Sequence, residues 1–280
     1  MDIQLFLSHA AVPYLPTLGP VHPDMMSGAV IKDVLRVATS TDFLPYDKDA
    51  RWSKDKLEQV LPALISQSPS GTIIPTLAHR GSTCLKLHVY GNSTAADIER
   101  ASEAARRLHP FPLRIITFSV VRPETMDDTS TIYLATPNPY ASSDVTTLDT
   151  LAPGIRSTLK DLAIDPDNAG FAFLAGEIDA GRINGPILVT TDQDRITGAI
   201  GPLQTAKDAN GKTYLLPPYF SVSEEARGQG KGRELWRAAM DWACREGAEY
   251  HVFEARAGSP AEAFYASVGT KSLGYRSLKD

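Results

Sequence analysis

Hydrophobic and polar residues follow two different periods along the chain, and together these predict an α/β protein with a mixed sheet. Apolar residues at three- and four-residue spacing predict helices over 57–65 and 94–108 in the first half. Segments rich in β-forming residues predict strands over 72–79 and 82–90, and the apolar stretch 113–121 predicts a buried strand. The first half therefore contains a strand–helix–strand unit over about 82–121.

The second half also alternates between predicted strands and helices, and its signals follow one another more closely along the chain. Strands are expected over 186–192, 195–201, 213–222 and 250–255. Pro217 and Pro218 lie inside the third of these strands, and proline removes a donor from the strand ladder. We therefore expect a bulge or a splayed edge there. An amphipathic helix should follow and end near Gly247.

Pro, Gly, Ser, Thr and Asp are concentrated between residues 122 and 153, and this turn-rich composition suggests a domain boundary. We place an N-terminal α/β domain at 1–128 and a second domain at 129–280. Both lengths are ordinary for a domain.

Composition and charge argue against several classes of function. The chain has 280 residues, and 28 basic against 33 acidic side chains give a net charge of -5, so nucleic acid is an unexpected partner. No apolar run is long enough to span a bilayer, and Met1–Gln4 lack the features of a signal peptide. The two cysteines and six scattered histidines show no metal-ligand spacing. We expect a soluble, cytoplasmic protein without a metal or a membrane partner.

The segment from Val222 to Gly232 carries the strongest chemical signal, because a strand runs into a glycine-rich turn that opens a helix. Glycines allow positive φ and let a ligand approach the backbone. The N–H groups at a helix start, aided by the helix dipole, can bind a pyrophosphate. A Walker A loop is excluded, because Gly232 follows Lys231 where Ser or Thr is needed. A dinucleotide fingerprint is excluded, because Gly228, Gly230 and Gly232 have the wrong spacing.

The loop resembles the acyl-CoA loop of the GNAT N-acetyltransferase superfamily, Arg/Gln-x-x-Gly-x-Gly/Ala. A second motif follows in the correct order: Ala261, Phe264, Tyr265 and Gly269 match the family's Ala-x-x-Phe-Tyr-x-x-x-Gly helix. The resemblance covers about 130–280 and implies a GNAT fold for the C-terminal half. It also raises the prospect that the N-terminal half is a degenerate second copy, in which no Gly-x-Gly loop joins strand 82–90 to its helix.

The resemblance also implies residue roles. Tyr265 corresponds to the tyrosine that protonates the departing thiolate, and the Val222 N–H to the group that binds the thioester carbonyl. On the same resemblance, the acyl-CoA-binding residues are Phe220, Val222, Arg227, Gly228, Gln229, Gly230, Lys231, Gly232 and Arg233. Three positions depart from the family pattern: Glu224 replaces a common proline, Gly258 a common asparagine, and Thr270 a common phenylalanine.

The general base has no fixed position in this family. Glu254, at the end of the strand after the loop helix, is our first candidate, followed by Tyr219 and Glu225. Each of these side chains, and Tyr265, has a purely structural alternative as a packing or surface residue.

The leading functional hypothesis is an N-acetyltransferase that moves an acetyl group from acetyl-CoA to a small primary amine. Two alternatives stay open: a longer or carrier-protein-bound acyl donor, and a non-catalytic acyl-CoA-binding protein. The N-terminal half could complete the sheet of the C-terminal half. A second copy of the chain, forming a homodimer, and an acyl carrier protein are both considered as partners.

Overall fold

The computed structural model describes residues 1–52, 55–141, 144–163 and 169–279. It consists of two compact units, and each is described by itself. Unit 1 comprises residues 1–135, 208–211 and 252–280, and unit 2 comprises 136–207 and 212–251. Strand β15 (Tyr250–Arg256) begins in unit 2 and continues from Val252 in unit 1.

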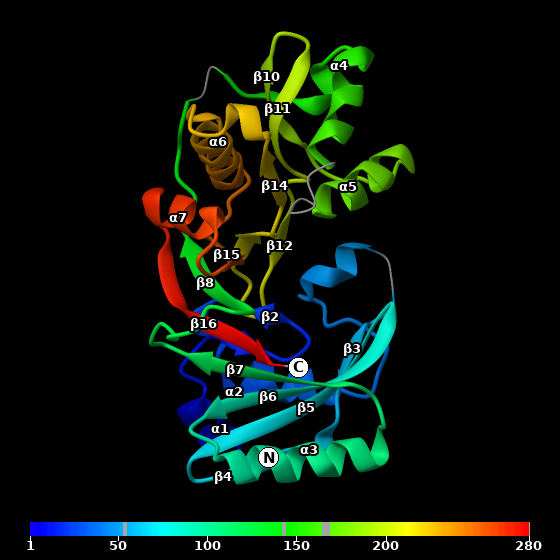
Figure 1. Cartoon of the computed structure of the whole chain (residues 1–280), viewed down its shortest axis with the longest axis vertical. Helices are drawn as coiled ribbons and strands as arrows, with labels where there is room; N and C mark the ends of the chain where they lie inside the picture. Colours follow the sequence, from blue (N-terminus) through cyan, green and yellow to red (C-terminus); the bar gives the residue numbers. More distant parts are fainter. Residues whose placement is uncertain (53–54, 142–143, 164–168, 280) are drawn as a thin grey trace. The chain divides into compact units, whose positions relative to one another are not determined.

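The sheet of unit 1 is mixed, and its strands lie in the order β15, β8, β16, β7, β6, β5, β3, with β4 added on β5 (Figure 1). The strands are β3 (Glu58–Val60), β4 (Ser66–Ser68), β5 (Gly71–Arg80), β6 (Ser82–Gly91), β7 (Leu113–Ser119), β8 (Thr129–Ala135) and β16 (Lys271–Lys279). The C-terminal strand β16 pairs antiparallel with β7 on one side and β8 on the other. The N-terminal half thus completes the sheet, as expected.

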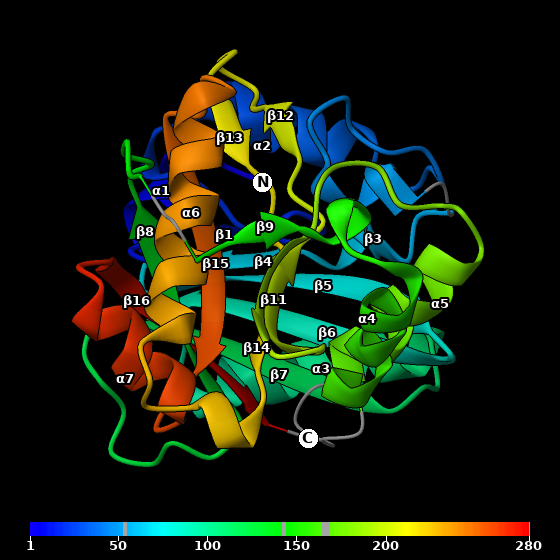
Figure 2. The same ribbon diagram turned by 90° about the horizontal axis from the view of Figure 1, so that it is seen from above.

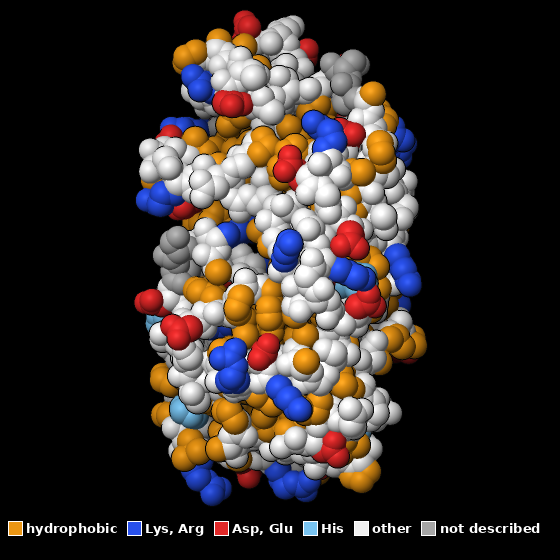
Figure 3. Space-filling model, turned by 180° about the vertical axis from the view of Figure 1, so that it is seen from behind, with side chains coloured by type: hydrophobic (Ala, Val, Ile, Leu, Met, Phe, Trp, Pro, Cys, Tyr) orange, Lys and Arg blue, Asp and Glu red, His pale blue; other side chains and the backbone are white. Residues whose placement is uncertain are grey.

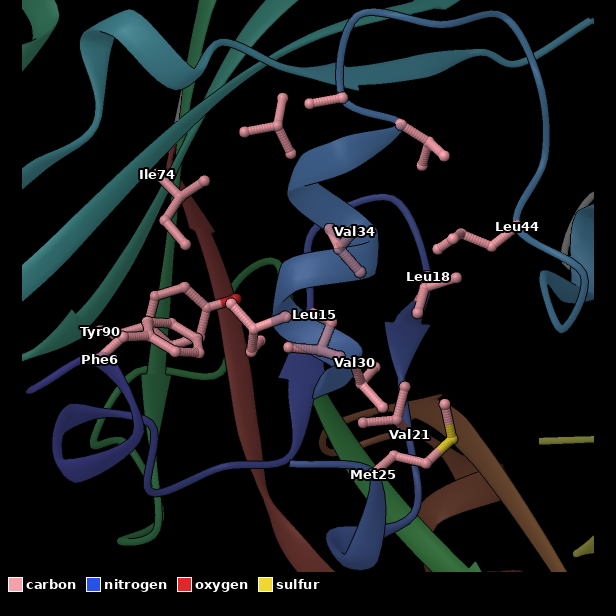
Figure 4. Packing of buried hydrophobic residues seen from close by; sticks show 14 residues of the cluster. Phe6, Leu15, Leu18, Val21, Met25, Val30, Val34, Leu44, Ile74 and Tyr90 are labelled. Atoms are coloured by element: carbon pink, nitrogen blue, oxygen red, sulfur yellow. The ribbon is translucent and has the colours of Figure 1, made fainter. Parts of the chain in front are cut away.

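Two hydrophobic layers cover this sheet. On one face, α3 (Ala95–Leu108) packs over β5 and β6, where Leu85 and Leu87 are fully buried. The other face is covered by α1 (Ile3–His9), α2 (Gly28–Arg36) and the segments between them. Figure 4 shows this second core, in which the rings of Phe6 and Tyr90 meet edge to face at 4.9 Å. The remaining elements before β4 are β1 (Tyr14–Leu15), β2 (Gly19–Pro20), η1 (Pro23–Met25), η2 (Lys48–Trp52) and η3 (Pro62–Leu64).

Unit 2 is built around a four-stranded sheet in the order β9, β10, β11, β14. Its strands are β9 (Thr146–Thr147), β10 (Leu188–Asp192), β11 (Arg195–Gly201) and β14 (Tyr219–Val222). Strands β12 (Thr205–Lys207) and β13 (Thr213–Leu215) pair with each other outside this sheet. Helix α6 (Lys231–Arg245) lies on one side of β11, and α4 (Pro153–Ser157), η5 (Thr158–Ala163) and α5 (Ala169–Asp179) lie on the other (Figure 2). The short turns η4 (Leu148–Thr150) and η7 (Glu224–Ala226) complete the unit.

Strands β5 and β6, which pair as a hairpin, and the unit β6–α3–β7 confirm the strands and the strand–helix–strand unit expected from the sequence, with β6 and β7 parallel. The helix predicted over 57–65 is wrong. Its residues form β3 and the 3-10 turn Pro62–Leu64 instead. Val60 pairs with Thr76 and is 1% exposed, so strand pairing and burial outweigh the helical spacing. Pro62, which has no N–H, ends the strand.

We expect Leu87→Ala to lower the free energy of unfolding by about 2–5 kcal/mol, because it opens a cavity under α3. The matched control is Leu108→Ala, since Leu108 lies at the end of α3 and is 63% exposed. That change should stay within about 0.5 kcal/mol of wild type in urea unfolding. Equal losses for the two variants would contradict the packing described here.

Candidate functional site

The single strand expected over 213–222 is two strands, β13 and β14, which belong to different sheets. Tyr214 and Leu215 of β13 pair in parallel with Tyr250 and His251 of β15. After Pro217-Pro218 the chain pairs with β11 instead. Because neither proline can donate to a ladder, the β13–β15 pairing ends at this point. The expected irregularity at the prolines is confirmed in this form.

The separation leaves β14 with one unpaired edge. Within the described residues, β14 pairs only with β11 and is the last strand of its sheet. The Ser223 N–H donates to the carbonyl of Thr197 at 2.8 Å, so this N–H faces β11. Because backbone groups alternate along a strand, the Val222 and Phe220 N–H groups face the opposite edge. Arg227 Nε donates to the Val222 carbonyl on that edge at 3.3 Å.

Two left-handed glycines shape the turn after β14. Gly228 has φ 77° and Gly230 has φ 83°, and residues with a side chain rarely adopt this backbone conformation. Gly230 is the residue before Lys231, where α6 begins, and it has no side chain to cap the helix. The first N–H groups of α6 lack intrahelical partners and carry the positive end of the helix dipole. Such a turn can bind a phosphate group.

Two side chains of this turn, those of Gln229 and Glu225, make local contacts. Gln229 Nε2 donates to the Glu225 carbonyl at 2.7 Å. Backbone hydrogen bonding at Glu225 and the Ser223 side chain lower the pKa of the Glu225 carboxyl. Glu225 therefore stays ionised at neutral pH and is a weak proton acceptor. Across the face shown in Figure 3, basic and acidic side chains are interspersed.

Tyr265 lies in unit 1, on α7 (Pro260–Ser267). The helix starts at an N-cap, where the Ser259 side chain accepts the N–H of Glu262. The Tyr265 ring lies 4.5 Å from the Phe253 ring and 5.7 Å from the Tyr133 ring, centroid to centroid. Burial raises the pKa of its phenol, with a further contribution from Tyr133. The hydroxyl therefore stays protonated at neutral pH, and the raised pKa makes it a weaker acid than an ordinary tyrosine.

Only part of the apolar face of α7 points inward. Phe264, Tyr265 and Val268 are half-buried, but Ala261 is exposed.

Glu254 also lies in unit 1, where it is held by an arginine that the sequence reasoning missed. Arg276 Nε donates to both carboxylate oxygens at 3.2 Å, and Nη2 donates to Oε2 at 3.0 Å. Arg276 Nη2 also donates to Ser130 Oγ at 3.2 Å. The sequence did offer one signal for this contact, because Arg276 is an arginine at an inward-facing position of the terminal strand. The ion pair gives Glu254 a fixed orientation.

The structure thus groups the candidate residues in two sets. Unit 2 brings together Phe220, Val222 and the glycine turn with Arg227 and Lys231. Unit 1 contains Tyr265 and Glu254. Among residues outside the masked gaps, no group of three or more His, Cys, Asp or Glu side chains is arranged to hold a metal. The helices in the described part of the chain are all too short or too polar to cross a membrane.

Comparison with protein-family models gives a match for part of the chain. Residues 149–270 match the family model described as the Acetyltransferase (GNAT) family. This segment belongs to the GNAT family. The match confirms the fold expected for the C-terminal half, and acyl transfer from coenzyme A is the general chemistry of GNAT enzymes. No curated protein matches the chain.

Several solved structures are similar to the chain at low identity. A GNAT acetyltransferase from Colwellia psychrerythraea is 10% identical, with 90% of this chain and 96% of that chain covered and a TM-score of 0.49. A tandem GNAT protein from the clavulanic acid biosynthesis pathway is 12% identical, covering 88% and 91%, with a TM-score of 0.46. A GCN5-related N-acetyltransferase from Sphaerobacter thermophilus is 16% identical, covering 74% and 79%, with a TM-score of 0.42. The degenerate N-terminal copy stays a prediction.

We expect the Tyr265 phenol to resist ionisation. The difference in ultraviolet phenolate absorbance between wild type and Tyr265→Phe should show no step up to about pH 10, where an ordinary tyrosine is half ionised. An alkaline titration monitored by absorbance measures this. A step at the ordinary value would contradict the buried environment of Tyr265.

Proposed function

We propose that the protein transfers an acetyl group from acetyl-CoA to a primary amine of a small molecule, by direct attack in a ternary complex. The observation that carries this proposal is the sequence of features in unit 2: a strand with an unpaired edge, a left-handed glycine turn and an uncapped helix start. This arrangement offers one N–H to a thioester carbonyl and several N–H groups to a pyrophosphate.

Different residues of the chain would bind different parts of acetyl-CoA. The N–H groups of residues 228–232 would bind the pyrophosphate of coenzyme A, supported by the charges of Arg227, Lys231 and Arg233. Phe220 and Val222 would line the pantetheine on the β14 edge. The Val222 N–H would donate to the thioester carbonyl and stabilise the negative charge that develops on its oxygen.

In the chemical step, the amine nitrogen attacks the thioester carbon and the carbonyl electrons move to oxygen. When the carbonyl re-forms, the carbon–sulfur bond breaks and the thiolate takes the Tyr265 proton. The amine loses a proton to a base, for which Glu254 is the first candidate. Its fixed contact with Arg276 supports a positioned carboxylate, although the same contact competes for its oxygens. The net charge of -5 slightly favours a cationic acceptor.

We expect wild type to bind acetyl-CoA and Gly230→Glu to lose binding, because glutamate blocks the turn and repels phosphate. Calorimetric titration measures both. The matched control is Gly247→Glu: Gly247 directly follows the C-cap of α6, has φ 76°, and, like Gly230, has no described atom within 4 Å of an added Cβ. Gly247→Glu should bind like wild type. Equal binding by all three proteins would place the ligand elsewhere.

A panel of primary amines would then test turnover, and binding without any acetylated amine would favour the non-catalytic alternative. For an accepted amine, we expect Tyr265→Phe to lower kcat about 100-fold, because the thiolate loses its proton donor. The acetyl-CoA Kd should not change. Steady-state kinetics should show a smaller loss with an acetyl thioester of a more acidic thiol, which needs no donor. Tyr275→Phe, in another half-buried tyrosine, is the control. The same loss with both thioesters would contradict the proton-donor role.

A further inference from the structure

Ser221, the residue before Val222 on β14, has a buried hydroxyl that lacks a partner. Ser221 is 7% exposed, and among the described residues its Oγ has no hydrogen-bond partner. Buried polar groups in proteins are normally hydrogen-bonded, so each exception calls for an explanation such as a missing ligand or water.

Neighbouring hydroxyls in the same sheet do have partners. Thr190 Oγ1 and Thr197 Oγ1 lie 3.2 Å apart. The Ser223 side chain hydrogen-bonds Glu225, whose pKa it lowers. Ser221 therefore differs from the hydroxyls around it, including that of Ser223, which lies two residues further along the chain, just after β14.

The position of Ser221 relative to the Val222 N–H is fixed by the covalent chain. Ser221 pairs with Ala199, which belongs to the core beneath α5 and η5. Its side chain thus stands on that face, while the Val222 N–H points along the sheet to the unpaired edge. Only Cβ, Cα and the carbonyl carbon lie between Oγ and that nitrogen. A χ1 rotation between staggered rotamers can turn the small hydroxyl toward the edge.

We propose that the Ser221 hydroxyl is a second hydrogen-bond donor to the thioester carbonyl, together with the Val222 N–H. This inference rests on the proposed function. When the amine attacks, the carbonyl electrons move to oxygen, and the two donors converge on that oxyanion. The Ser221 proton stays on Oγ throughout. When the carbonyl re-forms, the carbon–sulfur bond breaks, and the proton for sulfur comes from Tyr265.

Infrared spectroscopy of carbonyl-labelled acetyl-CoA tests this directly, because each hydrogen bond to a carbonyl lowers its stretching frequency. In wild type the bound carbonyl should absorb below its frequency in solution. Ser221→Ala should lose a substantial part of that shift and about 100-fold in kcat, with the acetyl-CoA Kd changed less than about 3-fold. Ser223→Ala, the matched control, should keep the wild-type shift.

Thermal unfolding separates this role from a structural one. Ser221→Ala should unfold at the same temperature as wild type or higher, because it removes an unsatisfied buried hydroxyl. A lower unfolding temperature together with an unchanged carbonyl shift would overturn the assignment, and so would bound acetyl-CoA with the same frequency in both proteins. Failure of wild type to bind acetyl-CoA would instead overturn the proposed function.

Discussion

The inability of Pro217 and Pro218 to donate backbone hydrogen bonds is the constraint on which the candidate site depends. Before these residues, β13 pairs with the start of β15, and after them β14 pairs with β11. One continuous strand would use the N–H groups of both edges in ladders. The break leaves the Val222 N–H on an unpaired edge, just ahead of the glycine turn that starts α6.

The terminal strand gives the N-terminal half a structural role in unit 1. β16 follows α7, the helix of Tyr265, and lies between β7 and β8. It also provides Arg276, which holds Glu254 through three donated hydrogen bonds at 3.0–3.2 Å. Deleting the N-terminal half would therefore remove a strand partner of the element that positions Glu254. The division at residue 128 into sequence domains stays a prediction.

Local chemistry made much of this fold predictable. Gly228 and Gly230 do adopt the left-handed backbone that glycine allows, and the Ser259 cap of α7 is also a local interaction. The helix predicted over 57–65 is wrong because the pairing of Val60 with β5 decides the structure of these residues. Such long-range pairing has no local signature in the sequence. The Arg276–Glu254 contact was hidden for the same reason, since 22 residues separate the partners. The missing partner of Ser221 is likewise visible only in three dimensions.

Backbone amide NMR during titration with CoA and then acetyl-CoA tests the central claim most directly, because it observes the N–H groups themselves. The account predicts that both ligands shift the amides of residues 228–232, and that the Val222 amide moves further with acetyl-CoA than with CoA. Saturable binding that leaves the 228–232 amides unshifted, or a Val222 amide that does not distinguish the two ligands, would contradict it.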